Sequence, residues 1–192
     1  MKAFADRYGL LRNRAKGEQA RAALERELGA TSSEEPVGVD FRGVRAMSVP
    51  FAEGFFVPLL GGWLTGYYDE QPIVVWGVDE DVAGTVDAVL RLRNMSVLAV
   101  QKDQAALLGG EEALEQTALL AYELGEFSAP ELAERLGITV QAANNRLKEL
   151  VQRGTLARVA GIAPSGGRQY VYRVPEMGSR GPRNRRPKKP AS

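Results

Sequence analysis

The chain has 192 residues and is 44% hydrophobic, enough to bury the core of one large domain or of two small ones, and two small domains fit its pattern better. It contains no cysteine and no histidine, which excludes disulfides, thiolate metal sites, imidazole bases and Ser-His or Cys-His nucleophiles, so we expect no catalytic site, metal or cofactor. The formal net charge is +1, but the charge is divided unevenly along the chain: residues 1–110 total −3 and residues 111–138 total −6. Residues 139–192 hold 12 Lys/Arg against 2 Asp/Glu and total +10. This excess of positive charge indicates a polyanionic partner, unless the basic end serves only to keep the protein soluble.

The first half of the chain alternates helical and strand patterns. Residues 14–28 place alanines and leucines at three- and four-residue spacing between charges, as an amphipathic helix does. Further strands are expected at residues 37–41, 73–78 and 97–100, and further helices at residues 51–60 and after Asp79. Such alternation predicts a mainly parallel sheet with helices packed on it.

Three local features bear on how these helices and strands form. Gly54 and Pro58 weaken the prediction of a helix over residues 51–60, because glycine and proline disfavour a helix interior. Asp79 is a good N-cap for the next helix. The apolar residues of 73–78, IVVWGV, do not alternate with polar ones, so this strand should be buried on both faces.

The segment VGVDFRGVRAMSVPFAEGF, residues 37–55, resembles the STAS domains of sulfate transporters and anti-sigma factor antagonists, and more closely the STAS-like domains of bacteria. The flanking segments RNRAKGEQARAAL and GVDEDVAGTVDAVLRLR fit the same pattern, so the resemblance covers roughly residues 8–100. It implies an α/β fold that dimerises the protein or receives a signal from a partner protein.

In anti-sigma factor antagonists, a hydroxyl at the start of a helix is phosphorylated to switch a partner off. The corresponding position here is Val49, which has no hydroxyl, and only a shift of register would make Ser48 the acceptor. The simpler interpretation makes Ser48 an N-cap with Pro50 in the first helical turn.

A break in the pattern follows the sheet. Residues 101–112, QKDQAALLGGEE, pass through two glycines into an acidic helix over residues 111–124, and we place a domain boundary there. The expected organisation is a STAS-like α/β domain over residues 1–108, an α+β domain over residues 109–175 and a basic disordered tail over residues 176–192.

Two short helical patterns follow the acidic helix. Ser128, with Pro130 and Glu131 after it, is a capping-box start for a helix ending near Leu136. Gly137 permits a left-handed stop, and Thr139 can cap a second helix that runs to about residue 153. Two helices packed across so short a turn have the geometry of a helix-turn-helix.

The second of these helices divides into two faces. Its apolar face is expected to hold Val140, Ala143, Leu147, Leu150 and Val151. Gln141, Ala142, Asn144, Asn145 and Lys148 should point outward. Amide side chains can form paired hydrogen bonds to adenine in the major groove, and the methyl of alanine can contact the methyl of thymine. The alternative is an ordinary solvated helix face.

Residues 155–174 predict two strands around a Pro-Ser-Gly-Gly tip. Helix, helix-turn-helix and hairpin in this order resemble the winged-helix DNA-binding domains of bacterial regulators, including their LxxLxxRGxL pattern, over about residues 111–175. The resemblance implies that residues 139–153 enter the major groove and that Arg168, near the wing tip, reaches the backbone or the minor groove. Phosphate contacts are then expected from Arg146, Lys148, Arg153 and Arg158.

These features predict a sequence-specific regulator of transcription that binds double-stranded DNA as a homodimer. The alternative is a protein-interaction module of a partner-switching pathway, with the winged helix as an adaptor. An enzyme is not expected, because Asp40, Glu53 and Asp79 lack the spacing of a metal site and are simpler as cap or turn residues. No segment has the apolar core of a signal peptide or the length of a membrane span, so we expect a cytoplasmic protein.

Overall fold

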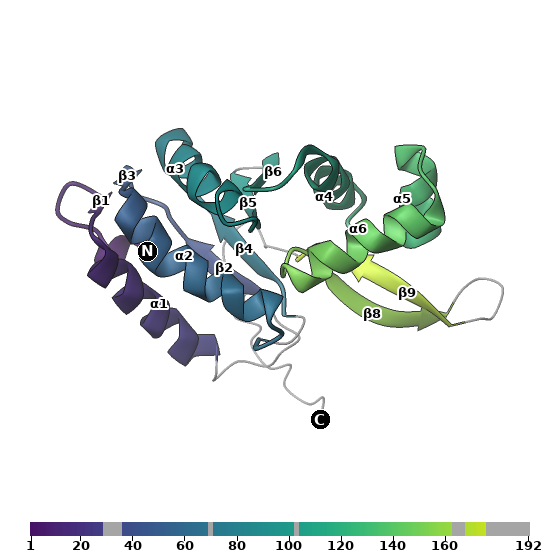
Figure 1. Ribbon diagram of the computed structural model, residues 1–192, viewed down its shortest axis with the longest axis horizontal. Coiled ribbons are helices and arrows are strands. Elements are labelled where there is room, and N and C mark those ends of the chain that lie inside the picture. The colour runs from purple at the N-terminus through teal and green to yellow at the C-terminus, as the bar shows by residue number, and fades with distance from the viewer. Residues whose placement is uncertain (29–35, 69–70, 102–103, 163–167, 176–192) are drawn as a thin grey trace, which may run out of the picture.

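The computed structural model of the chain describes residues 1–28, 36–68, 71–101, 104–162 and 168–175. A four-stranded sheet with the order β2-β4-β5-β6 occupies its centre (Figure 1). Its strands are β2 (Val37–Asp40), β4 (Ile73–Trp76), β5 (Val97–Gln101) and β6 (Gln104–Leu108). β2, β4 and β5 are parallel, and β6 runs antiparallel to β5. The prediction of a mainly parallel sheet is therefore confirmed.

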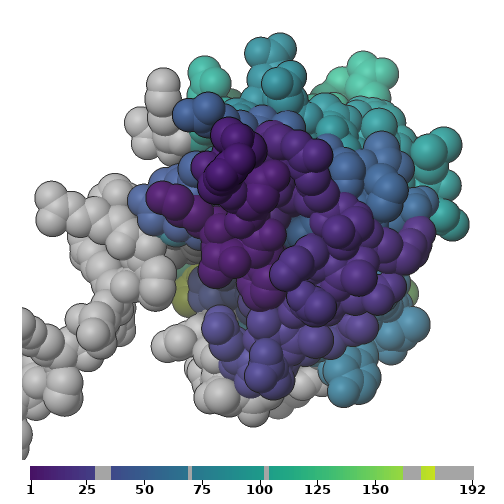
Figure 2. Space-filling model, turned by 90° about the vertical axis from the view of Figure 1, so that its left-hand side faces the viewer, coloured from purple at the N-terminus to yellow at the C-terminus, as the bar shows by residue number. Residues whose placement is uncertain are grey.

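Helices cover one face of this sheet. They are α1 (Arg14–Leu28), α2 (Val49–Leu64) and α3 (Glu80–Arg91), and the short elements η1 (Lys2–Phe4), β1 (Leu10–Leu11) and β3 (Ala46–Met47) accompany them. Ile73, Val75 and Val97 of the sheet join the hydrophobic cluster formed with these helices. Figure 2 views the molecule from the left-hand side of Figure 1, and there the first 28 residues cover much of the visible surface.

The other face of the sheet belongs to a second hydrophobic cluster. Val74, Leu98 and Leu107 are at most 1% exposed and are grouped with side chains of the C-terminal elements. The C-terminal elements are α4 (Glu112–Leu124), β7 (Glu126–Ser128), α5 (Ala129–Leu136), α6 (Val140–Gln152), β8 (Ala157–Ile162) and β9 (Arg168–Arg173), and all of them except β8 contribute side chains to this cluster. Because successive residues of a strand point to opposite faces, β4 is buried on both sides, as its unbroken apolar run predicts.

Helix α2 is longer than the sequence predicts, and Gly54 explains how it packs against α1. A Cβ on Gly54 would lie 2.6 Å from the carbonyl oxygen of Arg14, and one on Gly17 would lie 2.4 Å from the carbonyl oxygen of Phe51. The two glycines therefore let the backbones of α1 and α2 approach closely. Ser48 caps α2 by accepting a hydrogen bond from the Phe51 amide, with a proline in the first turn, as the simpler interpretation predicts.

Replacing Gly17 by alanine tests this close approach. Alanine favours a helix, but its Cβ would press on the Phe51 carbonyl, so we expect the free energy of unfolding to fall by about 1–3 kcal/mol. Gly84 in α3 is the matched control, because a Cβ there has nothing within 4 Å, and Gly84→Ala should raise the free energy of unfolding by about 0.5–1 kcal/mol. Urea unfolding of both variants measures the difference, and equal shifts would contradict the packing described.

The segment read as a break between two domains is partly sheet. Gln104–Leu108 forms β6, and the chain then turns through Gly109 and Gly110 into α4. The region before this turn (residues 1–108, the N-terminal region) and the region after it (residues 109–175, the C-terminal region) share the second hydrophobic cluster. The break in the pattern at residues 101–112 thus contains a strand that the sequence does not predict. Residues 176–192 lie outside the described residues.

Within the described part of the chain, no helix is both long enough and apolar enough to cross a bilayer.

Candidate nucleic-acid interface

The two helices α5 and α6 begin and end where the sequence predicts. Ser128 Oγ accepts a hydrogen bond from the Glu131 amide at 3.5 Å, and Thr139 Oγ1 accepts one from the Ala142 amide at 3.1 Å. Gly137 ends α5 in the left-handed conformation, with φ of 65°. Side-chain caps and a glycine stop fix both helix boundaries through local chemistry, so α6 starts at a defined residue.

One face of α6 lies in the core. Ala143, Leu147 and Leu150 are fully buried, and Val151 is 3% exposed. They share the second cluster with Leu132 and Ala133 of α5 and with Phe127 and Tyr172, whose rings stack 6.0 Å apart across β7 and β9. The sequence does not predict the strand β7, because this strand has only three residues, of which one is apolar.

The opposite face of α6 is open to solvent. Gln141, Asn144, Asn145 and Lys148 are exposed, and Ala142 is half-buried. Gln141 Nε2 donates a hydrogen bond to Asn145 Oδ1 at 3.1 Å, so the two amides lie side by side one helical turn apart. This pair leaves further amide donors and acceptors available to an outside partner.

Val140 lies on the open face and not on the apolar one. Its side chain is 44% exposed, which corrects the prediction that it joins Ala143 and Leu147 in the core. Val140, Asn144 and Lys148 are spaced four residues apart, and side chains at that spacing share one face of a helix. We call Val140, Gln141, Asn144, Asn145 and Lys148 the reading stripe.

Two arginines of this region have partners inside the protein. Arg146 is half-buried, and its Nη1 lies 3.4 Å from both the Ala113 carbonyl oxygen and Thr117 Oγ1 in α4. It links α4 to α6, and its phosphate contact stays a prediction. Arg153 is only 7% exposed and donates to Asn94 O and Ser96 Oγ in the N-terminal region. The phosphate contact predicted for Arg153 is therefore wrong for this conformation, because its guanidinium is turned away from solvent.

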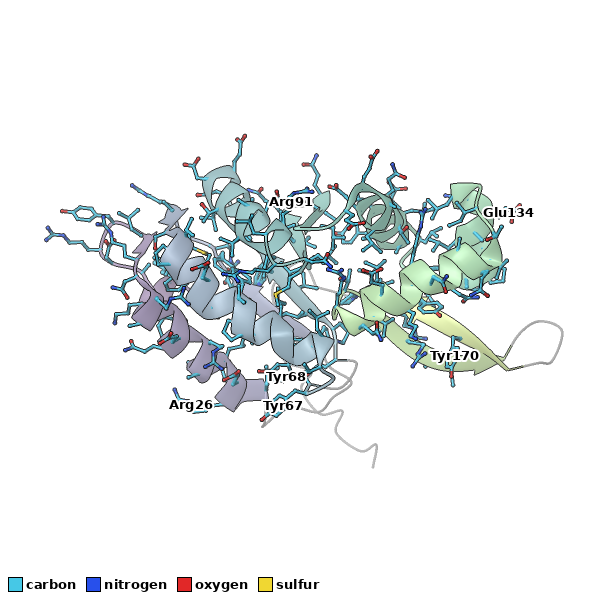
Figure 3. The ribbon with its side chains drawn as sticks, viewed as in Figure 1. Arg26, Tyr67, Tyr68, Arg91, Glu134 and Tyr170 are labelled. Atoms are coloured by element: carbon cyan, nitrogen blue, oxygen red, sulfur yellow. The ribbon has the colours of Figure 1, made fainter. Side chains whose placement is uncertain are left out.

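The strands β8 and β9 form an antiparallel hairpin that projects away from the N-terminal region (Figure 1). The guanidinium of Arg158 lies over the ring of Tyr170, 4.6 Å from its centroid, and Tyr170 is 53% exposed (Figure 3). Arg168 begins β9 and pairs with Ile162, and its side chain lies outside what the structure describes, as does the predicted tip at residues 163–167. The hairpin thus presents at least one cation beside an exposed aromatic ring.

The acidic residues considered as an alternative site have structural roles. Asp40 pairs with Arg42, Glu53 pairs with Arg14 and Arg93, and Asp79 caps α3 by accepting a hydrogen bond from the Val82 amide. Among the residues that the structure describes, no group of three or more His, Cys, Asp or Glu side chains is arranged to hold a metal ion.

The order α4, β7, α5, α6, β8 and β9, with an open helix face beside a hairpin, agrees with a known class of domain. Residues 127–165 match the family model for winged helix-turn-helix DNA-binding domains. The match runs from β7 into the hairpin, and it supports DNA as the partner of this part of the chain. Neither a search of curated proteins nor a search of solved structures gave a match. The winged helix-turn-helix is therefore similar to known domains, whereas no family match covers the N-terminal region.

Proposed function

We propose that this chain is a sequence-specific regulator of transcription that binds double-stranded DNA through α6. One observation supports this most directly: the reading stripe is exposed while the opposite face of the same helix is fully buried, within the segment that matches winged helix-turn-helix DNA-binding domains. A helix held this way can enter a major groove without losing its own packing.

The amide and apolar side chains of the reading stripe suit base pairs that contain adenine and thymine. Asn and Gln amides can donate to adenine N7 and accept from its N6 amino group, whereas Val140 and Ala142 offer methyl groups to the thymine methyl. Phosphate contacts would come from two residues of α6 and its cap, Thr139 and Lys148, and from two residues of the hairpin, Arg158 and Arg168. The site thus contains side chains that specify the DNA sequence and side chains that position the protein on the DNA backbone.

The other parts of the proposal concern the assembly. One α6 reads few base pairs, so we propose a homodimer bound to a palindromic site. The N-terminal region, as a STAS-like domain, would dimerise the chain or receive a signal from a partner protein, and the chain would act by binding and not by catalysis. Its mainly parallel sheet with helices on one face is compatible with this role.

Selection of bound duplexes from a random pool, followed by titrations at several salt concentrations, tests the proposal. Asn144→Ala and Asn145→Ala should each lose about 1–3 kcal/mol of discrimination between the selected and a scrambled sequence. Lys148→Ala should weaken binding to both sequences equally and reduce the salt slope by about 0.9. Gln116→Ala, which removes an exposed amide of α4, is the control and should leave both quantities unchanged.

Two outcomes would count against the proposal. If no duplex is retained at low salt, DNA binding fails, and a co-purified protein partner would then favour the partner-switching alternative. If a duplex is selected but the two asparagine variants discriminate as the unaltered chain does, then the reading stripe is not the specifying surface.

A further inference from the structure

Arg153 ties the end of α6 to the N-terminal region. It is the C-cap residue of α6, and its Nη1 donates to Asn94 O at 3.1 Å and to Ser96 Oγ at 3.4 Å. Its Nη2 and Nε donate to Glu149 Oε1 at 2.6 and 3.2 Å. Arginine is seldom this buried without partners, and its planar fork can bond to two elements at once. The side chain is thus fixed between α6 and the segment that joins α3 to β5.

A backbone contact and an apolar contact reinforce this attachment. The Gly154 carbonyl accepts a hydrogen bond from the Ile73 amide, the first residue of β4, at 2.7 Å. A Cβ on Gly154 would lie 2.6 Å from Trp63 Cδ1, so the backbone here lies directly against the indole ring. The carboxyl end of α6 is therefore held by the sheet, whereas its amino end carries the amides of the reading stripe.

Because the two ends of α6 are far apart, a small rotation at its carboxyl end produces a large displacement at its amino end. Helix α6 has 13 residues, which corresponds to about 20 Å at 1.5 Å per residue. A rotation of about 10° around its carboxyl end would move its first turn by about 3 Å, which equals the donor–acceptor distance of a hydrogen bond. Base recognition therefore depends on the angle at which α6 leaves the sheet.

We propose that Arg153 is a positioning residue for DNA recognition, which fixes the angle of α6 by bonding its last turn to the Asn94 carbonyl and the Ser96 hydroxyl. This inference rests on the proposed function, since it assigns the N-terminal sheet a part in reading DNA. It also makes the segment between α3 and β5 the point at which a change in the N-terminal region reaches the reading stripe. By linkage, DNA bound to α6 stabilises the same contacts.

The attachment can be measured without DNA. Because the chain has no cysteine, Leu92→Cys and Glu134→Cys introduce two spin labels, one in each region; Glu134 is labelled in Figure 3, as is Arg91, the neighbour of Leu92. We expect the distance distribution between the labels to broaden or shift in Arg153→Met, and hydrogen exchange of the Ile73 amide to become faster. Arg14→Met, which breaks an ion pair to Glu53 inside the N-terminal region and away from this segment, is the control and should change neither.

The effect on recognition is measured on the selected duplex. Arg153→Met should bind it about tenfold more weakly, within the range expected for coupling between two sites, while binding to a scrambled duplex changes less. Ser96→Ala should act in the same direction with a smaller loss, and Arg153→Lys should restore part of the affinity, since an ammonium can reach one partner group but not both. If Arg153→Met does not fold, Ser96→Ala and Arg153→Lys decide the question with the same readouts.

The possible results separate this inference from the proposed function. A folded Arg153→Met with unchanged label distances, unchanged Ile73 exchange and unchanged affinity would overturn the inference. If the unaltered chain selects no duplex, the proposed function fails, and the role of Arg153 in DNA recognition fails with it, even where the label distances show that it holds α6 in place.

Discussion

Leu147→Ala is expected to lower the free energy of unfolding by about 2–5 kcal/mol, because the leucine is fully buried and its loss leaves a cavity. Leu147 belongs to the cluster that also contains Val74, Leu98 and Leu107 of the sheet, so the damage should reach the N-terminal region. Both tryptophans, Trp63 and Trp76, lie in that region. Urea unfolding followed by tryptophan fluorescence should therefore show the lower midpoint, although the replaced side chain lies in α6.

The control for this variant is Leu92→Ala. Leu92 is 85% exposed, so the same substitution there should change the free energy of unfolding by less than about 0.5 kcal/mol. A Leu147→Ala variant whose far-UV circular dichroism shifts while the tryptophan transition stays in place would show that the two regions unfold separately. That result would contradict a second hydrophobic cluster that both regions share.

Gly154→Ala is expected to lower the free energy of unfolding as much as Leu147→Ala does. Gly154 has φ of 71°, where an alanine is strained, and a Cβ would also lie 2.6 Å from Trp63 Cδ1 and 3.0 Å from Ile73 Cγ2. Strain and overpacking together should lower the free energy of unfolding by about 2–5 kcal/mol. Since the Trp63 ring is one of the displaced groups, its fluorescence should change in the folded protein as well.

Gly66→Ala separates strain from overpacking. Gly66 has φ of 74°, close to that of Gly154, but a Cβ there has nothing within 4 Å. We expect a loss of about 1–2 kcal/mol, from backbone strain alone. If thermal unfolding gives equal losses for the two variants, the contact between Gly154 and Trp63 does not constrain the end of α6.

Elements whose boundaries depend on local chemistry could be predicted from the sequence. The helix at Arg14–Leu28 has the predicted bounds, and Asp79, Ser128 and Thr139 cap helices as expected. Each of these predictions uses only the few residues around a helix end, and side-chain caps work in the same way in any surroundings. The exposed amides of α6 follow from the same helical periodicity.

The features that the sequence does not predict depend on contacts between distant segments. Gln104–Leu108 is short and rich in alanine, so only its pairing with β5 makes it a strand. From the sequence, Arg153 is expected to be an exposed cation at the end of an amphipathic helix. Its burial arises from its contacts with Asn94 and Ser96, which lie 59 and 57 residues earlier in the chain. Val140 lies at the first helical position, where periodicity alone does not show which neighbours cover a side chain.

Photo-crosslinking shows whether the open face of α6 contacts DNA. A photoreactive residue at Gln141 in the reading stripe is compared with one at Gln116, which is exposed on α4. With the selected duplex, we expect crosslinks to bases from position 141 and none from position 116. Crosslinks from position 116 alone, or none from position 141 while the duplex stays bound, would contradict this expectation.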